Sequence, residues 1–368
     1  MALENMPIVL DNGADYLKAG FAGESAPRIL VPMLTTHSLS SWGTAEWFVG
    51  EHAKALRREL PVRCPISHGQ VTNFEELAII WQYMYAKELR TNPADHPVLI
   101  TEYPVLPQYH RERMAEMAFE KFSVPAIYFS NQSVLSLYAV GLSTGLSVDI
   151  GTETTNVVPV VETFLITDAV KRRTIGGVDV TNFLQRLLVS GNPKVSRFIT
   201  ADVTRYFKER LCYVAPTLSS EALSYADSQP VSYQTPDGQL VNIGRERLIA
   251  PEILFSPKQA GLEGNGIQHS IVAAIRECPE ELHSYLNGTI VLSGGTTMSK
   301  GLPERVRQEV KNLTGEKVVV NVHASPHRKY AVWIGGSILG SLNTFHKLLI
   351  SKKEFEEIGP SVVHQKCS

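Results

Sequence analysis

The sequence has few of the features that mark a secreted, zinc-binding or membrane-spanning protein. Its four cysteines, Cys64, Cys212, Cys278 and Cys367, are scattered and form no C-x-x-C pair. This spacing argues against a zinc site or a disulfide framework and favours a reducing compartment. The N-terminus lacks the basic and long apolar regions of a signal peptide, and no apolar run reaches membrane-spanning length. We therefore expect a cytoplasmic protein without a membrane partner.

The chain also lacks the charge excess and the loop motif of two large function classes. The formal net charge is −2, so the composition does not favour direct nucleic-acid binding. The G-x-x-x-x-G-K-[ST] loop of many nucleotide-binding proteins is absent. The 368 residues, of which 43% are hydrophobic, are enough for two domains or one large bilobed unit.

The strongest feature that is present is a repeated pattern. Residues 8–21 predict a buried strand, a polar tip from Asp11 to Asp15 and a second strand, and Gly13 can adopt the positive φ of a tight tip. Residues 147–158 repeat the order of strand, aspartate (Asp149), one residue, glycine, polar tip and strand. Such tips can turn backbone N–H groups toward an anion, and Lys18 would add a positive charge. Two similar halves could grip one phosphate chain, but two ordinary hairpins of an α/β protein would give the same pattern.

Strands alternate with helices along the rest of the chain, which predicts α/β layers. Asn73 is expected to cap a helix that runs to Arg90, with Glu76 completing a capping box. Asp179 and Asp202 are expected to be the N-caps of two later helices. Residues 289–301, TIVLSGGTTMSKG, predict a strand, a glycine turn and a helix start, which is an arrangement that binds phosphate or ribose.

Several specific motifs resemble the actin family, and they are colinear over almost the whole chain. They are DNG…LKAGFAG (11–23), TEYP (101–104), QSVLSLYA (132–139), KERLCYVA (208–215), LSGGTTM (292–298), RKYAVWIGGSIL (328–339) and the C-terminal GPSVVHQKC. The resemblance implies the fold shared with sugar kinases and heat-shock chaperone ATPases. That fold has two lobes, each with a five-stranded mixed sheet, and ATP or ADP with Mg²⁺ binds between them.

The resemblance further implies four subdomains and a set of nucleotide contacts. An outer subdomain would comprise residues 1–32, 65–139 and 331–368, a small one 33–64, an inner one 140–175 and 263–330, and a fourth 176–262. The implied nucleotide-binding residues are Asp11, Asn12, Gly13, Lys18, Gly151, Thr152, Asp179, Lys208, Glu209, Gly294, Gly295, Thr296, Met298 and Lys329. Asp11 and Asp149 would hold Mg²⁺ through water, and Gln132 and Asp149 would help to order the attacking water.

The departures from the family pattern cluster in the two hairpin tips. Ala14 and Asp15 stand where the family has Ser-Gly, Glu153 replaces a glycine, and Asn156 replaces the histidine that helps to order the attacking water. A carboxylate about 5 Å from a phosphate charge costs roughly 3 kcal/mol per unit-charge pair at an effective dielectric constant near 20. These substitutions therefore predict weak binding of the terminal phosphate and slow or absent hydrolysis, unless the carboxylates turn into solvent or Mg²⁺ compensates them.

Segments that serve actin polymerisation have changed as well. Residues 35–47 correspond to the actin loop that inserts into the next subunit, but the loop is shortened, and residues 258–262 have lost two large apolar side chains of the family's plug. The groove that takes partner helices in actin keeps Tyr138, Gly141, Thr144, Leu339, Leu342, Thr344 and Leu348, although such residues could also belong to the core.

Two functions from different classes fit these residues. The first is an actin-related structural or interaction subunit of a larger assembly, with degenerate phosphate loops and weak or absent ATPase. The second is a divergent actin that binds ATP, polymerises and hydrolyses. An axonemal, dynactin-type or chromatin-remodelling assembly could each house such a subunit, which extends the expected location from the cytoskeleton to a cilium or the nucleus. We expect protein partners and no filaments.

Overall fold

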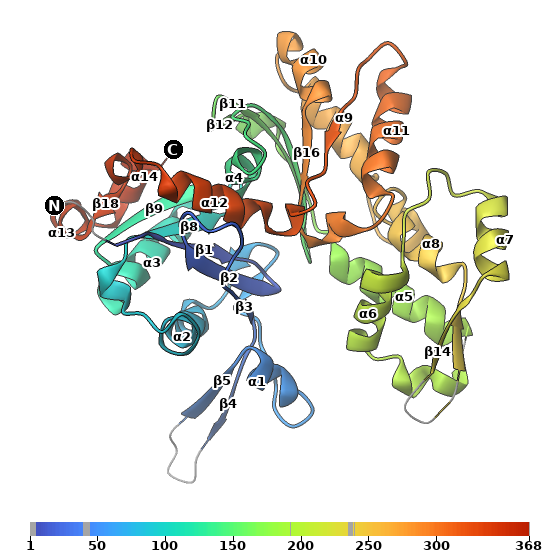
Figure 1. The fold of residues 1–368 in the computed structure, drawn as a ribbon, viewed down its shortest axis with the longest axis horizontal. Coiled ribbons are helices and arrows are strands. Elements are labelled where there is room, and N and C mark those ends of the chain that lie inside the picture. Colours follow the sequence, from blue (N-terminus) through green and yellow to red (C-terminus); the bar gives the residue numbers. More distant parts are fainter. Residues whose placement is uncertain (1–4, 40–44, 192, 235–237, 239, 368) are drawn as a thin grey trace. The chain divides into compact units, whose positions relative to one another are not determined.

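The computed structural model describes residues 5–39, 45–191, 193–234, 238 and 240–367 (Figure 1). The chain forms two compact units, each of which is described by itself. The first unit contains the chain up to Thr144, residues 160–165 and residues 330–368, and the second contains residues 145–159 and 166–329. The finer division into four subdomains stays a prediction.

The first unit is built on a six-stranded mixed sheet with the order β18-β9-β8-β1-β2-β3. The strands are β1 (Ile8–Asn12), β2 (Tyr16–Phe21), β3 (Ile29–Pro32), β8 (Val98–Glu102), β9 (Ala126–Asn131) and β18 (Ile350–Ser351). β1 is parallel to β8 and antiparallel to β2, and all five of its residues are buried. The predicted first hairpin is therefore confirmed at the centre of a sheet.

Helices cover this sheet and bury its apolar residues. They are α2 (Phe74–Tyr83), η1 (Met84–Leu89), α3 (Gln108–Glu116), η3 (Met117–Lys121), α4 (Gln132–Tyr138), α12 (Ala331–Ser341), α13 (Lys352–Ile358) and α14 (Val363–Lys366). α12 lies against α4 at very short range, because a Cβ added at Gly335 would be 1.8 Å from the carbonyl oxygen of Leu135. The small residues of this apolar helix thus allow it to pack closely against α4.

A smaller part of the first unit extends from the end of β3. It contains β4 (Thr35–Leu39), β5 (Ala45–Val49), α1 (Glu51–Ala55), β6 (Ile66–Ser67) and β7 (Gln70–Val71). β4 and β5 pair as an antiparallel hairpin. The expected inserting loop is therefore a hairpin, and its tip at residues 40–44 lies outside the described residues.

A second six-stranded sheet, whose strands belong to the second unit apart from residues 160–165, has the main path β12-β11-β10-β16-β17, with β13 paired to β11. The strands are β10 (Gly145–Ile150), β11 (Thr155–Val161), β12 (Phe164–Leu165), β13 (Lys171–Arg173), β16 (Ile290–Ser293) and β17 (Val322–His323). β10, β16 and β17 are parallel, whereas β12 and β13 are antiparallel to β11. Both sheets thus have one strand more than the five that were expected, because short edge strands join them.

The second unit has its own helices and core. The helices are α5 (Gly177–Gly191), α6 (Ala201–Leu211), α7 (Ser220–Ser228), α8 (Glu246–Glu252), α9 (Ile267–Arg276), α10 (Glu280–Gly288) and α11 (Leu302–Thr314), and β14 (Val231–Gln234) pairs with β15 (Leu240–Ile243). The turn of that hairpin, expected at Asp237-Gly238, falls largely outside the described residues. Short 3-10 helices along the whole chain are η2 (Pro93–Asp95), η4 (Thr167–Ala169), η5 (Pro193–Phe198), η6 (Pro257–Ala260), η7 (Gly295–Met298), η8 (Arg328–Tyr330), η9 (Phe345–Lys347) and η10 (Pro360–Val362).

Three of the predicted helix starts differ in detail from the structure. Asn73 caps α2 as expected, but the carboxylate of Glu76 is buried and accepts a hydrogen bond from Thr35 Oγ1 at 2.9 Å instead of completing a capping box. Thr200, not Asp202, is the N-cap of α6. Asp179 lies within the first turn of α5, where its carboxylate accepts a hydrogen bond from the backbone N–H of Gly176 at 2.8 Å.

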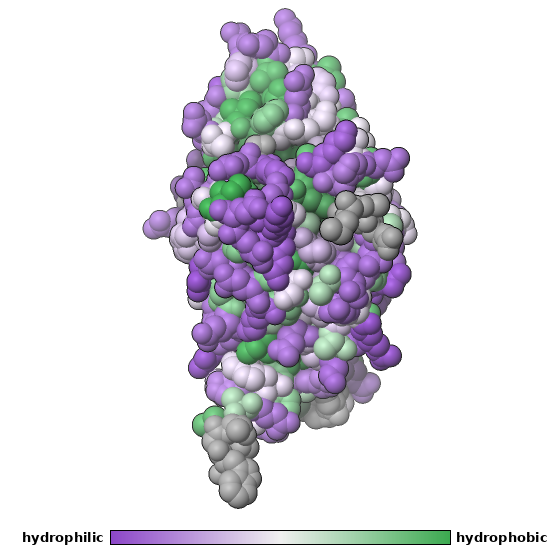
Figure 2. Space-filling view, turned by 90° about the vertical axis from the view of Figure 1, so that its left-hand side faces the viewer, coloured by the Kyte–Doolittle hydropathy of each residue, from purple (hydrophilic) through white to green (hydrophobic). Residues whose placement is uncertain are grey.

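The surface and the cysteines agree with the composition. On the face that Figure 2 shows, hydrophilic residues cover most of the surface, and hydrophobic residues gather in a few separate areas. The four cysteines are free thiols. None of the described helices combines the length and the apolar character that crossing a membrane would take.

Candidate functional site

The first hairpin places Asp11 and Lys18 opposite each other on β1 and β2. Its tip is narrow, because Gly13 N donates hydrogen bonds to the carbonyl oxygens of Asp11 and Tyr16 at 3.2 Å. The expectation that Gly13 adopts a positive φ is wrong. Glycine is favoured there for a different reason, since an added Cβ would lie 2.9 Å from the carbonyl oxygen of Tyr16.

The carboxylate of Asp11 is the centre of a buried polar network. Lys18 Nζ lies 2.6 Å from its Oδ2, while Thr101 Oγ1 and Gln132 Nε2 donate to its Oδ1 at 2.8 and 3.2 Å. Asp11 is 2% exposed and Gln132 is 7% exposed. Lys18, which the sequence offers as a positive charge beside an anion, forms an ion pair with Asp11 in the structure. The positive charge expected for a phosphate is thus already used in part by this aspartate.

Asn12 adds a second polar group to the same hairpin. Its Oδ1 accepts a hydrogen bond from the indole N–H of Trp81 at 3.0 Å, but its buried Nδ2 has no partner among the described residues. An unpaired buried donor is unusual and indicates a place where a ligand or a water molecule would be bound. Sequence reasoning missed Trp81 and the role of Thr101, because both contacts are made between segments far apart in the chain. The only available signal was the TEYP motif, which contains Thr101.

The altered residues of the first tip are held through their backbone atoms. The Cys64 thiol donates to the carbonyl oxygen of Ala14 at 3.2 Å, and Met33 N donates to that of Asp15 at 2.9 Å. Ala14 packs against the core, and Asp15 is half-buried. The tip is therefore a fixed part of the first unit, and Asp15 brings a carboxylate to it.

The second hairpin lies in the other unit and is closed by a hydrogen bond from Gly151 N to the carbonyl oxygen of Thr154 at 2.9 Å. The start of α5 supports this tip, because Gly177 N donates to Gly151 O at 3.0 Å and Val178 N donates to Thr152 O at 2.8 Å. The first N–H groups of α5 are therefore occupied by the hairpin. They hold its carbonyl groups in place and are not left for an anion.

Asp149 is positioned like Asp11, by a hydroxyl group from the neighbouring parallel strand. Ser293 Oγ donates to Asp149 Oδ1 at 2.9 Å, as Thr101 Oγ1 does to Asp11. Gly294 follows with φ +91°, and an added Cβ there would be 2.4 Å from the carbonyl oxygen of Ile150. The duplicated sequence pattern thus corresponds to a duplicated local structure, and the glycine turn is sterically required.

Some of the residues that the resemblance assigns to the nucleotide lie around the start of α5. Lys208 Nζ donates to Gly177 O at 2.9 Å, and Thr296 Oγ1 donates to Gly151 O at 2.7 Å. Lys329 lies beside Gly295, since a Cβ added at this glycine would be 4.0 Å from Lys329 Cγ, and Met298 is 40% exposed. Glu209 is directed elsewhere and forms an ion pair with Arg205 at 2.9 Å on the surface of α6.

Asn156 is the most unusual polar residue of the second hairpin. It lies on β11 and is 1% exposed, yet neither Oδ1 nor Nδ2 has a hydrogen-bond partner in the described part of the chain. Burying an amide without such partners costs about 1–3 kcal/mol in proteins. Glu153, the other altered residue, is half-buried at the tip of the same hairpin.

The residues of the expected partner groove all belong to the first unit, but they differ in exposure. Leu339 is 7% exposed and packs with Tyr138 and Leu348 in one apolar cluster, whereas Leu342 is 50% exposed. Gly141 has open space around it and φ +76°, Thr144 Oγ1 accepts a hydrogen bond from Glu162 N at 2.9 Å, and Thr344 is exposed. Leu342 is therefore available to a partner, while Leu339 contributes to the core.

The chemistry of these groups fits an adenine nucleotide in part. Among the described residues, no group of three or more His, Cys, Asp or Glu side chains could hold a metal ion directly. Mg²⁺ beside nucleotide phosphates usually keeps several waters and binds through one or two carboxylates, and each hairpin carries one aspartate of this kind, Asp11 in the first unit and Asp149 in the second. In each unit, taken by itself, one buried asparagine has polar atoms without a partner among the described residues, Asn12 through Nδ2 and Asn156 through its whole amide.

Comparison with known protein families gives a match that agrees with this geometry. The family model described as Actin matches residues 2–368. The match includes both hairpins, both sheets and the glycine turn at Gly294.

Proposed function

Because the chain belongs to the actin family over its whole length, we propose that it is an actin-related structural or interaction subunit of a larger cytoskeletal or motor-associated assembly. In this proposal its ATPase activity is weak or absent, and its main contacts are with protein partners. The proposal concerns the role of this member, since actin-family proteins generally bind ATP or ADP with Mg²⁺.

The proposal rests mainly on Asn156, on its residue type and on its missing hydrogen-bond partners. The resemblance to actin puts a water-ordering histidine at this position, whereas an amide neither takes up a proton nor carries a charge at neutral pH. Both polar atoms of Asn156 are buried without partners among the described residues, so this side chain is not tied into a network that would orient a water molecule. Gln132 and Asp149 would be left to order the attacking water.

The first hairpin supports weak binding of the terminal phosphate. When bound, Mg²⁺ neutralises part of the phosphate charge. The protein's own cation beside the first tip, Lys18, is paired with the buried Asp11, so a phosphate would compete with that carboxylate for it. Asp15 and Glu153 add negative charge to the two tips. Lys208 and Thr296, which the resemblance assigns to the nucleotide, donate to Gly177 O and Gly151 O and are thus connected to the second hairpin.

Phosphate release from Mg-ATP by the purified chain tests the proposal. We expect turnover no faster than background, and we expect Asn156→His combined with Glu153→Gly to raise it. The purified chain should also stay monomeric in Mg²⁺, salt and ATP when it is sedimented. Phosphate release by the natural chain at an actin-like rate would contradict the proposed loss of ATPase activity.

The second candidate, a divergent actin that polymerises and hydrolyses ATP, is favoured by one observation. Asp11, Thr101 and Gln132 form a hydrogen-bonded framework around the aspartate of the first hairpin, so two residues that the resemblance assigns to Mg²⁺ and to the attacking water, Asp11 and Gln132, are kept and held in place. Sedimentation separates the two candidates, because long filaments at micromolar concentration would support this second one. The shortened loop between β4 and β5 favours the monomer.

The exposed part of the groove gives a test of the interaction role. We expect Leu342→Asp to abolish binding of the native partner, recovered from extract by pull-down and identified by mass spectrometry, with an almost unchanged thermal midpoint. Leu339→Asp is the matched control, since this leucine is 7% exposed and should instead lower the midpoint strongly. Retained binding by Leu342→Asp would exclude this surface. The identity of the partner then decides between axonemal, dynactin-type and chromatin-remodelling assemblies, and hence between cytoplasm, cilium and nucleus.

A further inference from the structure

A pocket whose lining includes three basic residues lies in the second unit, between the end of α6 and the start of α11. We call it the basic pocket. It has a volume of about 290 Å³, and its lining consists of Arg210, Leu211, Cys212, Tyr213, Val214, Arg247, Lys300 and Gly301. None of the residues that the resemblance to actin assigns to the nucleotide lines it. The pocket is therefore a separate feature of this chain.

Three cations line the basic pocket, and none of its described lining residues is a carboxylate. Arg247 donates hydrogen bonds to the carbonyl oxygens of Gly244 at 3.0 Å, Ala226 at 3.2 Å and Gln229 at 2.8 Å, all of them neutral acceptors. Arg210 lies over the ring of Tyr206, with 5.8 Å between its Cζ and the ring centroid. Within the part of the chain that the structure describes, neither Arg210 nor Lys300 forms an ion pair. The pocket thus concentrates positive charge in a protein whose net charge is −2.

The thiol inside the pocket does not supply the missing negative charge. Cys212 is 6% exposed, and its burial raises its pKa to about 12, even though Lys208 and Arg247 act in the opposite direction. The thiol is therefore neutral at physiological pH. The side chains that line the pocket offer cations, one phenol and apolar surface, which is a composition that favours an anionic ligand.

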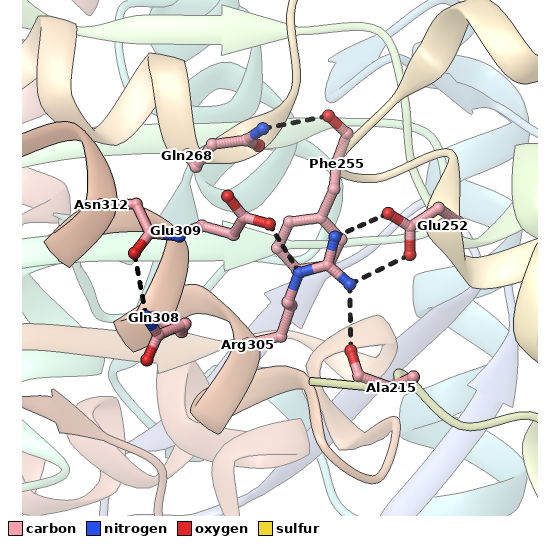
Figure 3. A network of polar contacts seen from close by, with 8 residues as sticks. All are labelled: Ala215, Glu252, Phe255, Gln268, Arg305, Gln308, Glu309 and Asn312. Atoms are coloured by element: carbon pink, nitrogen blue, oxygen red, sulfur yellow. Dashed lines mark hydrogen bonds and ion pairs between the residues drawn. The ribbon is translucent and has the colours of Figure 1, made fainter. Parts of the chain in front are cut away.

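The backbone that carries these side chains is held firmly. Val214 N donates to the carbonyl oxygen of Lys300 at 2.8 Å, and Gly301, with φ +79°, approaches so closely that an added Cβ would be 2.1 Å from Val214 O. The next residue is fixed as well, because Arg305 Nη1 donates to the carbonyl oxygen of Ala215 at 2.9 Å. Figure 3 shows this guanidinium between Ala215, Glu252 and Glu309, with the ring of Phe255 beside it. The pocket is thus formed before any ligand arrives, which reduces the cost of binding.

We propose that the basic pocket binds a small phosphorylated anion through Arg210, Arg247 and Lys300. Arginine forks match the oxygens of phosphate in pairs, and lysine adds a compact charge. The volume lies near the lower end of the range for small-molecule sites, about 300–1,000 Å³, and it suits a compact ligand better than a peptide segment. The proposal does not depend on the proposed loss of ATPase activity.

Isothermal titration calorimetry of the full chain with inorganic pyrophosphate tests this proposal, at low salt and in saturating Mg-ADP. We expect binding that persists in ADP and weakens as salt is added. Lys300→Ala and Arg210→Ala should each weaken it at least tenfold, with unchanged thermal midpoints because both side chains are exposed. Lys317→Ala, an exposed lysine of the same unit outside the pocket, is the matched control and should bind normally.

Three results would overturn the proposal. Absence of pyrophosphate binding would do so, and so would binding that Lys300→Ala leaves unchanged. Competition by ADP would place the anion in the nucleotide site. The same titration is repeated with citrate and with a short acidic peptide in place of pyrophosphate. Tighter binding of either would be a fourth result against the proposal, because the pocket would then prefer carboxylates or peptides to phosphate.

Discussion

The two hairpins share a pattern but differ in how their buried polar groups are satisfied. In each, a strand ends in an aspartate that accepts a hydrogen bond from a hydroxyl group on the neighbouring parallel strand, Thr101 for Asp11 and Ser293 for Asp149. Lys18 follows Asp11 at the same spacing as Asn156 follows Asp149. At this equivalent position the first hairpin has a cation that pairs with its aspartate, and the second has a neutral amide without a hydrogen-bond partner among the described residues.

This difference separates the structural role of such a hairpin from its chemical role. The Asp11 network needs no ligand to be stable, because Lys18, Thr101 and Gln132 already satisfy the carboxylate. Asn156 carries an energetic cost in the structure as it stands, since its buried polar atoms have lost their hydrogen bonds with water. We infer that the first hairpin contributes to the stability of its unit, whereas the second contains a position that was not optimised for stability.

The largest expected effect comes from breaking the network of the first hairpin. Lys18→Met leaves the carboxylate of Asp11 buried without its cation, and removing one partner of a buried pair costs about 3–5 kcal/mol. We expect a loss near 3 kcal/mol in the free energy of unfolding, measured by urea denaturation, because Thr101 and Gln132 still donate to Asp11.

Lys353→Met is the control for this prediction, since it removes an exposed ion pair with Glu357 at 3.7 Å. It should change the free energy of unfolding by less than about 0.5 kcal/mol. Equal effects of the two substitutions would show that the Asp11–Lys18 pair is not a stabilising network, and the contrast between the hairpins would then fail.

The network also shows where prediction from the sequence ends. The strand–tip–strand pattern and the N-cap at Asn73 follow from local spacing, and the structure confirms them. The hydrogen bond from Trp81 to Asn12 and that from Thr35 to Glu76 depend on how distant segments pack, so no local pattern contains them. The cap of α6 was mispredicted because Thr200 and Asp202 are both good caps in one short segment, and only the structure decides between them.

The second hairpin should respond in the opposite direction when its unpaired amide is removed. Asn156→Leu replaces a buried polar group that has no partners in the described chain with an apolar group of similar shape. We expect the free energy of unfolding to rise by about 1–2 kcal/mol.

Asn287→Leu is the matched control for that substitution. Asn287 is also buried and its Oδ1 has no partner among the described residues, but its Nδ2 donates to the carbonyl oxygen of His283 at 2.8 Å, and so the same change should bring a smaller gain. A loss of stability in Asn156→Leu would mean that Asn156 is hydrogen-bonded in solution, to water or to a ligand. The buried polar groups of both hairpins would then have hydrogen-bond partners, and the two hairpins would not differ in this respect.

The contrast can be sharpened by removing the carboxylates from both tips. The combination Ala14→Ser, Asp15→Gly and Glu153→Gly should raise the affinity for ATP at least tenfold, which corresponds to about 1.4 kcal/mol. A fluorescence titration with labelled ATP measures this change. Glu263→Gly, an exposed residue outside both hairpins, is the control for the loss of one negative charge. Nanomolar ATP binding by the natural chain would show that the carboxylates do not repel the phosphates.

The smallest effect is expected for Glu354, a paired carboxylate that lies near the surface. It tests whether an ion pair stabilises the folded state when the pair is not deeply buried. Lys366, at 2.6 Å, and the backbone N–H of Ser351 lower the pKa of Glu354 from its ordinary value of 4.5 to about 2. The folded state therefore favours the charged carboxylate. Its stabilising contribution is present above about pH 4.5 and is lost as the pH falls toward 2. Because the side chain is 35% exposed, solvent screening should limit this contribution to about 1 kcal/mol or less.

Urea denaturation between pH 2 and pH 6 measures the contribution of Glu354. Glu354→Gln should lower the free energy of unfolding at pH 6 and should flatten its fall between pH 4.5 and pH 2, because glutamine does not titrate. Glu357→Gln removes a carboxylate from the same helix, α13, whose ion pair is longer and whose side chain is 62% exposed, so its curve should follow that of the natural chain. If the two variants gave the same curve, pairing at the surface would contribute nothing measurable. Satisfied polar groups would then stabilise this unit only where they are buried, as they are around Asp11.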